Sequence, residues 1–416
     1  MFSANEFLDS MHNGIFNMKL LYDLTATQPS PESRFHGGGA YGEVLFFKLL
    51  EYLNDFSFVC YYDAKSYINP DILERIKTHG ILLYDINEKS VAEIVREAKI
   101  ERLYSAMLNL NQNIPLGEVE VFTTVHGLRT LEMPFDSIML EYASSLKEKI
   151  KYRLFMGPAK NYYLKKLKVI NGRLVTDPRI NVITISNHSL ASIKSFYPET
   201  AQKEIPVFAS PTFAQLDTYN PVTENKRLSL DALHKENITE KKYFLITSAA
   251  RWAKNALRAV RAFDELCDAE NTNAYKLVVT GVTRKNVFTK KLRHQERFVF
   301  LGYVERDFLD LLTEQAYAFI YPSLNEGFGY PPIESMKYGI PVAASGTSSI
   351  PEVCGDAALY FDPYSISEIK NRIVQLLDAT IYEEYVHRAK EHYLIVAKKQ
   401  KEDLAKLAEY VIFKKN

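Results

Sequence analysis

Apolar segments alternate with helix-like segments twice along this 416-residue chain, and this repeated alternation constrains the fold most strongly. In the first half, short apolar runs predict strands, and segments with helical apolar spacing separate them. The predicted strands of this series are 18–25, 56–63, 81–86, 102–107 and 119–125. Strands joined by helices pair in parallel, so the first half predicts a doubly wound sheet.

The second half repeats this pattern after a polar segment. Its predicted strands are 243–248, 275–281, 298–302, 316–322, 340–344 and 358–361. Ser365 and Glu368 have the spacing of a capping box at the start of a predicted helix, 366–378. We therefore expect an α/β protein with two Rossmann-like, doubly wound domains facing an interdomain cleft, because ligands bind beyond the carboxyl ends of such strands. The expected segments are an N-terminal domain 1–220, a linker 221–241 and a C-terminal domain 242–401.

Charge and cysteine content narrow the class of protein. Lysine plus arginine number 51, and aspartate plus glutamate also number 51. Proteins that hold nucleic acid usually carry a positive excess, so no nucleic-acid partner is expected. The three cysteines lie far apart, which fits a reducing compartment and excludes a cysteine zinc site. The chain has neither a membrane-spanning apolar run nor a signal-peptide core at its start, so we expect a cytoplasmic protein.

The segment 325–334 (NEGFGYPPIE) follows a predicted strand and opens a predicted helix that ends near Gly339. Its glycines let the backbone approach a ligand closely, and the amides at a helix start can bind phosphate. Glu326 and Glu334 could face one ligand and accept hydrogen bonds from sugar hydroxyls. The alternative is a helix-capping glycine loop with solvated carboxylates.

A second candidate segment, 248–255 (SAARWAKN), lies between a predicted strand and a predicted helix. This is a position typical of phosphate sites. Arg251 and Lys254 could together neutralise the charge that develops on a diphosphate leaving group. The alternative is a solvated basic loop. Trp252, the only tryptophan, is expected to pack rather than to act chemically.

A glycine cluster, 36–42 (HGGGAYG), follows the first predicted strand. The spacing Gly37-x-Gly39-x-x-Gly42 matches a dinucleotide fingerprint, and Asp63 ends the next predicted strand. This favours an NAD-dependent oxidoreductase as an alternative function. The segment between the first strand and the cluster is, however, long for the tight turn which that motif requires.

Residues 302–362 resemble the nucleotide-sugar-binding core of retaining glycosyltransferase family 4 (glycosyl transferases group 1), a family with the GT-B fold. The matching pieces are GYV at 302–304, AFIYPS at 318–323, EGFG at 326–329, Pro332, ESM at 334–336, Gly339, PV at 341–342 and PEVCGDA at 351–357. The resemblance implies transfer of a hexose-type sugar (mannose, glucose, rhamnose or similar) from a nucleotide-diphosphate sugar. The acceptor would be a hydroxyl of a glycan or lipid-linked molecule, in cell-surface polysaccharide assembly. It also implies that a last helix, within 402–416, packs back on the first domain.

The resemblance also implies roles for individual residues. Glu334 would grip the ribose hydroxyls, and Glu326 would lie beside the donor sugar. The loop around Gly327, with the amides of Phe328 and Gly329, would contact the sugar or its phosphate. The remaining implied donor contacts are the backbone around Val304, Lys254, Arg251, and Gly38 and Gly39 of the glycine cluster.

His126 ends a predicted strand and so points into the expected cleft. The resemblance implies that it contacts the donor sugar, without acting as a general base. Two positions depart from the family. Gly127 stands where an aspartate is common, and Ser248 stands where the family usually has an arginine, which leaves Arg251 as a candidate substitute. His188 is a further candidate, equally well explained as a structural histidine.

Metal and cofactor sites are not expected. The chain has no Asp-x-Asp pair, so Arg251, Lys254 and helix amides would stabilise the diphosphate instead. The segment 147–173 carries nine lysines or arginines and one glutamate, with aromatic residues between them. It could contact an anionic membrane surface peripherally, on the inner face of the cell membrane, or be a solvated face. A GT-B-fold epimerase and a non-catalytic sugar-nucleotide binder remain further alternatives.

Overall fold

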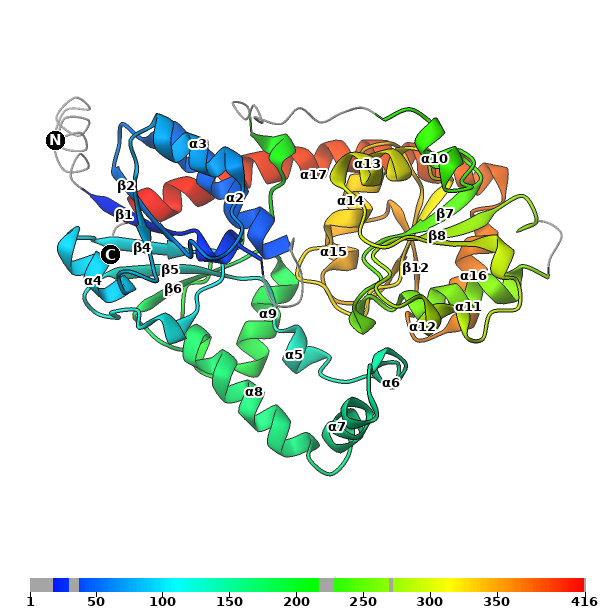
Figure 1. Ribbon diagram of the computed structural model, residues 1–416, viewed down its shortest axis with the longest axis horizontal. Coiled ribbons are helices and arrows are strands. Elements are labelled where there is room, and N and C mark those ends of the chain that lie inside the picture. Colours follow the sequence, from blue (N-terminus) through cyan, green and yellow to red (C-terminus); the bar gives the residue numbers. More distant parts are fainter. Residues whose placement is uncertain (1–17, 30–36, 217–227, 269–271, 415–416) are drawn as a thin grey trace. The chain divides into compact units, whose positions relative to one another are not determined.

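The computed structural model describes residues 18–29, 37–216, 228–268 and 272–414. The chain divides into two compact units, each built around a six-stranded parallel sheet (Figure 1). Unit 1 takes its described residues from Met1–Gly127, Ile170–Glu224 and Lys398–Asn416, and unit 2 takes its described residues from Leu128–Val169 and Asn225–Ala397. The predicted α/β fold with two doubly wound sheets is confirmed.

The sheet of unit 1 has the strand order β3-β2-β1-β4-β5-β6. Its strands are β1 (Lys19–Asp23), β2 (Ser57–Tyr62), β3 (Leu82–Asp85), β4 (Arg102–Ser105), β5 (Glu120–Val125) and β6 (Ile180–Thr184). The first five match the predicted apolar runs, whereas β6 was not predicted. Its helices include α2 (Gly37–Leu49), α3 (Pro70–Thr78), α4 (Val91–Glu97) and α9 (Asn187–Phe196). Leu20 and Tyr22 of the central strand β1 are fully buried, as a two-sided layer of helices requires.

The sheet of unit 2 has the strand order β12-β11-β10-β7-β8-β9. Its strands are β7 (Tyr243–Ile246), β8 (Lys276–Val279), β9 (Phe298–Phe300), β10 (Ala318–Tyr321), β11 (Val342–Ser345) and β12 (Ala358–Phe361). Its helices include α10 (Asp231–Lys235), α11 (Ala256–Leu266), α12 (Lys285–Thr289), α13 (Arg306–Glu314), α14 (Tyr330–Met336), α15 (Ile350–Cys354) and α16 (Ile366–Gln375). Every strand predicted for this half is present. The predicted linker 221–241 lies partly outside the described residues, and its described part contains α10.

The segment 128–169 differs from the predicted domain limits, because it belongs to unit 2 although it was expected in the first domain. It contains α5 (Arg129–Glu132), α6 (Met139–Tyr142), α7 (Leu146–Met156) and the start of α8 (Lys160–Val175). Ile138 and Tyr142 are buried in the same core as α11 and α16. Asp136 forms an ion pair with Arg258 of α11 at 2.9 Å. These contacts join residues far apart in sequence, so the sequence pattern could not predict them.

The last helix, α17 (Ala379–Phe413), is longer than expected and contributes to both units. Its part from Lys398 onward packs on unit 1. There the Asp403 carboxylate accepts a hydrogen bond from the amide of Ala209 at 2.8 Å. The Arg102 guanidinium donates to the carbonyl of Val411, also at 2.8 Å. Carbonyl groups at the end of this helix thus accept hydrogen bonds from a cationic side chain on β4.

The capping box predicted at the start of α16 is only half formed. The hydroxyl of Ser365 accepts a hydrogen bond from the amide of Glu368 at 3.2 Å. The Glu368 carboxylate, however, accepts from the amide of Asp362 instead of returning to Ser365. The Glu368 carboxylate, which the capping-box pattern assigned to the Ser365 amide, therefore binds an amide in the turn after β12 instead.

Glu43 on α2 is a largely buried acid whose protonation should affect the stability of unit 1. Burial raises its pKa to about 7, although a hydrogen bond from Asn69 at 3.0 Å acts in the opposite direction. An acid with a raised folded pKa contributes stability below its unfolded pKa, and this contribution is lost as pH rises through the folded pKa. Glu43→Gln should therefore raise the free energy of unfolding by about 2–3 kcal/mol at pH 8 and hardly change it at pH 4.

Hydrogen exchange of the β1 and β2 amides at both pH values measures this effect in unit 1. Glu74→Gln, an exposed glutamate on α3, is the matched control and should stay within about 0.5 kcal/mol of the unsubstituted protein. Equal protection in Glu43→Gln and the unsubstituted protein at pH 8 would show that ionisation of Glu43 does not destabilise the folded protein.

Candidate functional site

The loop that follows β10 is held by hydroxyl groups from the loop that follows β11. Ser349 Oγ donates hydrogen bonds to the carbonyls of Glu326 and Phe328 at 2.9 and 3.0 Å. Ser348 Oγ accepts from the amide of Glu326 at 2.9 Å. Thr347 Oγ1 donates to the carbonyl of Leu324 at 3.1 Å. The Glu-Gly-Phe-Gly loop is therefore fixed at the carboxyl edge of the sheet, where ligands bind in open α/β folds.

Lys254 and Glu326 form a close ion pair at this edge. Lys254 Nζ lies 2.5 Å from Glu326 Oε1, and the two side chains keep only 10% and 15% of their surfaces accessible. The Lys254 ammonium also lies 5.6 Å from the centre of the Tyr321 ring. The structure thus brings together two residues that the sequence placed in separate motifs.

The two charges of this pair attract each other, although burial lowers the pKa of Lys254. Burial alone would raise the pKa of Glu326, but the Lys254 ammonium and a hydrogen bond from Ser323 hold that pKa below its usual value. We therefore describe Glu326 as an ionised carboxylate. Arg251 is exposed, precedes Lys254 in the same loop, and adds a second positive charge near it. A ligand that reaches Lys254 meets two positive charges, of which Glu326 balances one, at low solvent exposure.

The backbone at Lys254 is set by Asn255, which adopts a left-handed conformation with φ of 57°. Its side-chain amide donates to the carbonyls of Pro322 and Pro363 at 3.0 and 2.7 Å. Its side-chain oxygen accepts from Arg258 at 2.8 Å. Asn255 therefore ties the Lys254 loop to the ends of β10 and β12, which explains an asparagine after this lysine.

Glu334 lies in the first turns of α14, which begins after Gly329. Gly329 has φ of +104°, a conformation that favours glycine, and it forms the N-terminal cap of this helix. The Glu334 carboxylate lies 3.4 Å from Arg306 Nη2 on α13 and keeps 39% of its side-chain surface accessible. Desolvation by the surrounding protein raises its pKa, and Arg306 partly offsets this rise. The helix starts two residues before Pro332, slightly earlier than expected.

The segment around Val304 follows β9. The carbonyl of Gly302 accepts a hydrogen bond from the amide of Gly281 at 2.8 Å. This bond holds Gly302 against the loop that follows β8. Tyr303 keeps 61% of its surface accessible, and Val304 is half-buried. The backbone here is fixed at the same sheet edge, as an approach to a base through backbone groups would require.

His126 ends β5 in unit 1, as predicted. Its Nε2 lies 2.9 Å from the carbonyl oxygen of Ala106, so this nitrogen serves as a hydrogen-bond donor to the backbone. Its ring packs edge-on against Tyr41 at 5.0 Å. His188 lies on α9. The contacts of His126 and the position of His188 do not assign a chemical role to either histidine.

Residues 37–42 of the glycine cluster form the first turns of a helix. Gly38 and Gly39 lie in the first turn of α2, which begins at Gly37, and His36 is outside the described residues. A Cβ atom at Gly38 would lie 2.5 Å from Met107 Sδ, so a larger residue there would displace the flexible end of the Met107 side chain. In the dinucleotide fingerprint the first glycine makes a tight turn directly after the strand. Here β1 ends at Asp23, well before the helix, so the geometry does not fit that motif.

The hydroxyl residues Ser323, Ser348 and Ser349, and the ion-pair partner Arg306, were not predicted as site residues. A signal for Ser348 and Ser349 existed, because the run Ser345–Ser349 (SGTSS) follows a predicted strand. Arg306 carried no such signal, since its pairing with Glu334 depends on how α13 packs beside α14.

Among the described residues, no group of three or more histidine, cysteine or acidic side chains could hold a metal ion. No helix in the described ranges combines the length and apolar character that crossing a membrane requires.

Comparison with known families relates part of the chain to glycosyltransferases. Residues 231–393, which include all the site residues of unit 2 described above, match the family model described as glycosyl transferases group 1. The chain is 33% identical to O-antigen chain mannosyltransferase B of Escherichia coli over 153 residues, which is 36% of this chain and 40% of that protein. It is 33% identical to O-antigen chain mannosyltransferase RfbU of Salmonella typhimurium over 184 residues, which is 41% of this chain and 51% of that protein. The matches thus span about half or less of these relatives.

Solved structures share the whole fold at low sequence identity. A glycosyltransferase from Rickettsia africae covers 97% of this chain and is itself covered completely, with a TM-score of 0.62 and 13% identity. A second structure is WaaG, a glycosyltransferase involved in lipopolysaccharide biosynthesis. Its match spans 95% of this chain and 99% of WaaG, with a TM-score of 0.62 and 12% identity. The chain therefore has the GT-B fold, and its residues 231–393 are similar to the glycosyl transferases group 1 family.

Proposed function

We propose that this protein is a glycosyltransferase that moves a hexose-type sugar from a nucleotide-diphosphate sugar to a hydroxyl of a glycan or lipid-linked acceptor. The observation that carries the proposal is the buried Lys254–Glu326 pair at the carboxyl edge of a sheet in a family domain. The relatives named as O-antigen mannosyltransferases favour mannose as the sugar and polysaccharide assembly as the process. HepE from Anabaena, a structural neighbour with a TM-score of 0.61, was solved with UDP-glucose.

The proposed reaction retains the anomeric configuration. The bond between the anomeric carbon and the diphosphate oxygen breaks, and its electron pair goes to the diphosphate. The acceptor hydroxyl oxygen forms the new bond from the same face, and its proton passes to the leaving phosphate. Lys254, with Arg251, would stabilise the charge on the leaving diphosphate without a metal ion. Glu326 would hold Lys254 in place and lie beside the donor sugar.

Glu334→Ala should weaken donor binding, because this carboxylate would accept hydrogen bonds from the ribose hydroxyls. Hydrogen bonds to a charged group contribute about 1.5–3 kcal/mol, which corresponds to roughly ten- to hundredfold in affinity. Calorimetric titration with the nucleoside diphosphate that the unsubstituted protein binds measures the change. Asp310→Ala is the control, because Asp310 also lies near Arg306, at 3.6 Å, but outside the family motif. Unchanged affinity in Glu334→Ala would show that the ribose is bound elsewhere.

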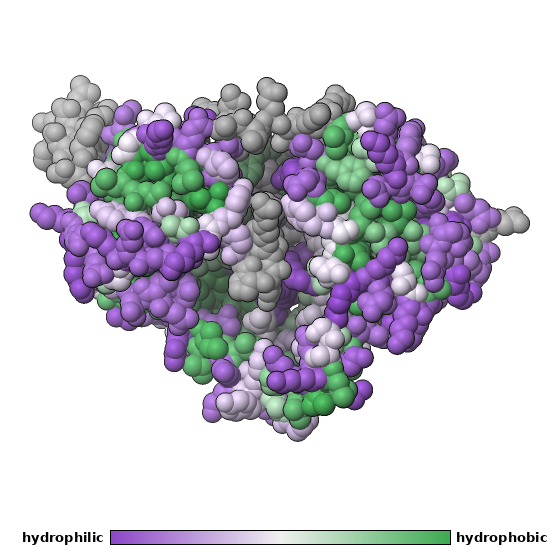
Figure 2. All heavy atoms as spheres, in the orientation of Figure 1, coloured by the Kyte–Doolittle hydropathy of each residue, from purple (hydrophilic) through white to green (hydrophobic). Residues whose placement is uncertain are grey.

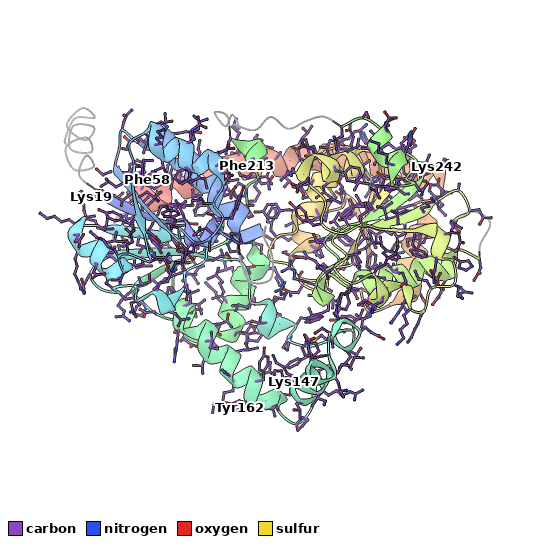
Figure 3. The ribbon with its side chains drawn as sticks, viewed as in Figure 1. Lys19, Phe58, Lys147, Tyr162, Phe213 and Lys242 are labelled. Atoms are coloured by element: carbon purple, nitrogen blue, oxygen red, sulfur yellow. The ribbon has the colours of Figure 1, made fainter. Side chains whose placement is uncertain are left out.

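A peripheral membrane contact through α7 is part of this proposal. Leu146, Ile150 and Leu154 are exposed at 73%, 50% and 47% and follow a four-residue spacing, so they form one apolar stripe. Lysines flank this stripe, and Figure 2 shows apolar surface among hydrophilic side chains in this part of unit 2. Figure 3 shows Lys147 on α7 and Tyr162 on the neighbouring helix α8. An apolar stripe with basic flanks suits the surface of an anionic bilayer.

Leu146→Glu/Ile150→Glu should reduce binding to vesicles that contain phosphatidylglycerol at least about tenfold, because two apolar side chains no longer enter the interface. Co-sedimentation with the vesicles measures binding. Leu394→Glu, at an equally exposed position on α17, is the control and should leave binding unchanged. Unchanged sedimentation of the double variant would favour the alternative of a solvated helix.

A further inference from the structure

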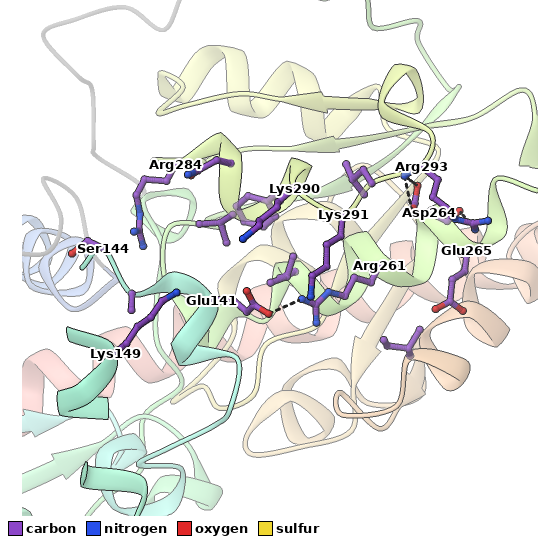
Figure 4. Close-up of a pocket in the computed structure, with 17 residues that line it drawn as sticks. Glu141, Ser144, Lys149, Arg261, Asp264, Glu265, Arg284, Lys290, Lys291 and Arg293 are labelled. Carbon is purple, nitrogen blue, oxygen red and sulfur yellow. Dashed lines mark hydrogen bonds and ion pairs between the residues drawn. The ribbon is translucent and has the colours of Figure 1, made fainter. Parts of the chain in front are cut away.

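A basic pocket of about 410 Å³ lies within unit 2, between the α6–α7 segment, α11 and the segment 284–293 (Figure 4). Its volume falls in the range of ordinary ligand sites, about 300–1,000 Å³. Its walls carry six cationic side chains and three carboxylates. The cationic residues are Lys149, Arg261, Arg284, Lys290, Lys291 and Arg293. None of them belongs to the site built around Lys254, Glu326 and Glu334.

The three carboxylates of the pocket are already paired. Glu141 lies 3.2 Å from Arg261, and Glu265 lies 2.7 Å from Lys370. Asp264 accepts hydrogen bonds from the amides of Arg293 and His294. Because the carboxylates of the pocket walls already have these partners, little negative charge remains to balance the other cations.

Four cations of the pocket have no ion-pair partner within the described ranges of the chain: Lys149, Arg284, Lys290 and Lys291. Figure 4 shows the charged ends of Lys149, Arg284 and Lys290 directed toward the space between them. The nearby Glu148 carboxylate accepts hydrogen bonds from Tyr152 and from the Ser144 hydroxyl, at 2.6 and 2.7 Å, which lower its pKa, and the Arg284 charge lowers this pKa further. Like charges that converge in this way favour a bound anion with several oxygen atoms.

We propose that this pocket is a second anion-binding site, which takes a phosphate-bearing ligand such as a diphosphate or a phosphate ester. Arg284 is half-buried and offers a planar set of donors that fits phosphate oxygens. Lys149, Lys290 and Lys291 are exposed at the rim and supply charge. This site is independent of the proposed donor site, because α14 and its Glu334 contribute nothing to its walls.

Calorimetric titration with inorganic pyrophosphate at low salt tests the proposal. The double variant Lys290→Ala/Lys291→Ala removes two exposed cations and should weaken one binding event by at least about tenfold. Lys77→Ala/Lys235→Ala removes two exposed lysines outside the pocket and should bind as the unsubstituted protein does. Lys254→Ala should keep this binding event, which separates it from binding of pyrophosphate at the proposed donor site.

The proposal is overturned if Lys290→Ala/Lys291→Ala binds pyrophosphate as the unsubstituted protein does, or if Lys254→Ala alone abolishes all binding. A competition arm with vesicles identifies the source of the phosphate. Competition between pyrophosphate and phosphatidylglycerol vesicles, but not phosphatidylcholine vesicles, would identify a lipid headgroup. Pyrophosphate binding without such competition would identify a free phosphate compound. Both results support the pocket as an anion site.

Discussion

Lys254→Ala is expected to lower the turnover of sugar transfer by about a hundred- to thousandfold while changing donor affinity much less. Removal of one preorganised donor that stabilises developing charge typically has an effect of this size. Lys254 has this role in the proposed reaction because its side chain is buried and lies 2.5 Å from Glu326, and because Arg251 adds a second positive charge in the same loop. Release of the nucleoside diphosphate under saturating donor measures turnover.

Two further variants separate chemistry from folding. Lys254→Ala leaves the Glu326 carboxylate buried without its ammonium partner, which should also destabilise unit 2. Lys254→Ala/Glu326→Gln removes both charges, so it should recover stability without recovering activity. Lys254→Arg keeps the charge and should retain part of the turnover. Full activity in Lys254→Ala would remove this lysine from the mechanism.

Asp136→Ala is expected to lower the free energy of unfolding of unit 2 by about 3–5 kcal/mol. The two oxygens of Asp136 lie 2.9 and 3.1 Å from Arg258 Nη2, and the two side chains keep only 8% and 13% of their surfaces accessible. Loss of one partner of such a buried pair leaves an uncompensated charge. The pair joins the segment 128–169 to α11, so this segment should also lose protection from hydrogen exchange.

Urea unfolding followed by tryptophan fluorescence measures this loss, because the only tryptophan, Trp252, lies in unit 2 and packs against its core. Glu141→Ala is the matched control. It breaks the Glu141–Arg261 pair on the same segment, but these side chains are 43% and 34% accessible. An exposed pair contributes at most about 1 kcal/mol. Similar losses in both variants would show that burial does not strengthen the Asp136 pair.

Most of the strands were predictable because they are short apolar runs buried on both sides of a parallel sheet, although β6 was not predicted. Glu326, Glu334 and Lys254 were predictable as candidates because family motifs carry them. Their mutual geometry was not, since the Lys254–Glu326 contact joins loops after two different strands, β7 and β10. The helical conformation of Gly37–Gly39 was not apparent from the sequence, because three consecutive glycines disfavour a helix by propensity.

The segment 128–169 shows the same limit. Its sequence contains a basic run with aromatic residues, which predicts an exposed surface. The sequence does not indicate which part of the chain this segment packs against. The packing of this segment on α11 and α12 depends on Asp136 and on the buried residues Ile138 and Tyr142. Their contacts are formed only in the folded unit. The basic pocket escaped prediction for the same reason, because its cations come from segments that are far apart in the chain.

In the proposed function, unit 2 binds a nucleotide-diphosphate sugar through Lys254, Glu326 and Glu334. Calorimetric titration of the unsubstituted protein and of Glu334→Ala with UDP, GDP, dTDP and NAD, without added metal, tests this binding. We expect one nucleoside diphosphate to bind, NAD not to bind, and Glu334→Ala to weaken binding. Binding of NAD alone, or diphosphate binding unaffected by Glu334→Ala, would refute the proposed function.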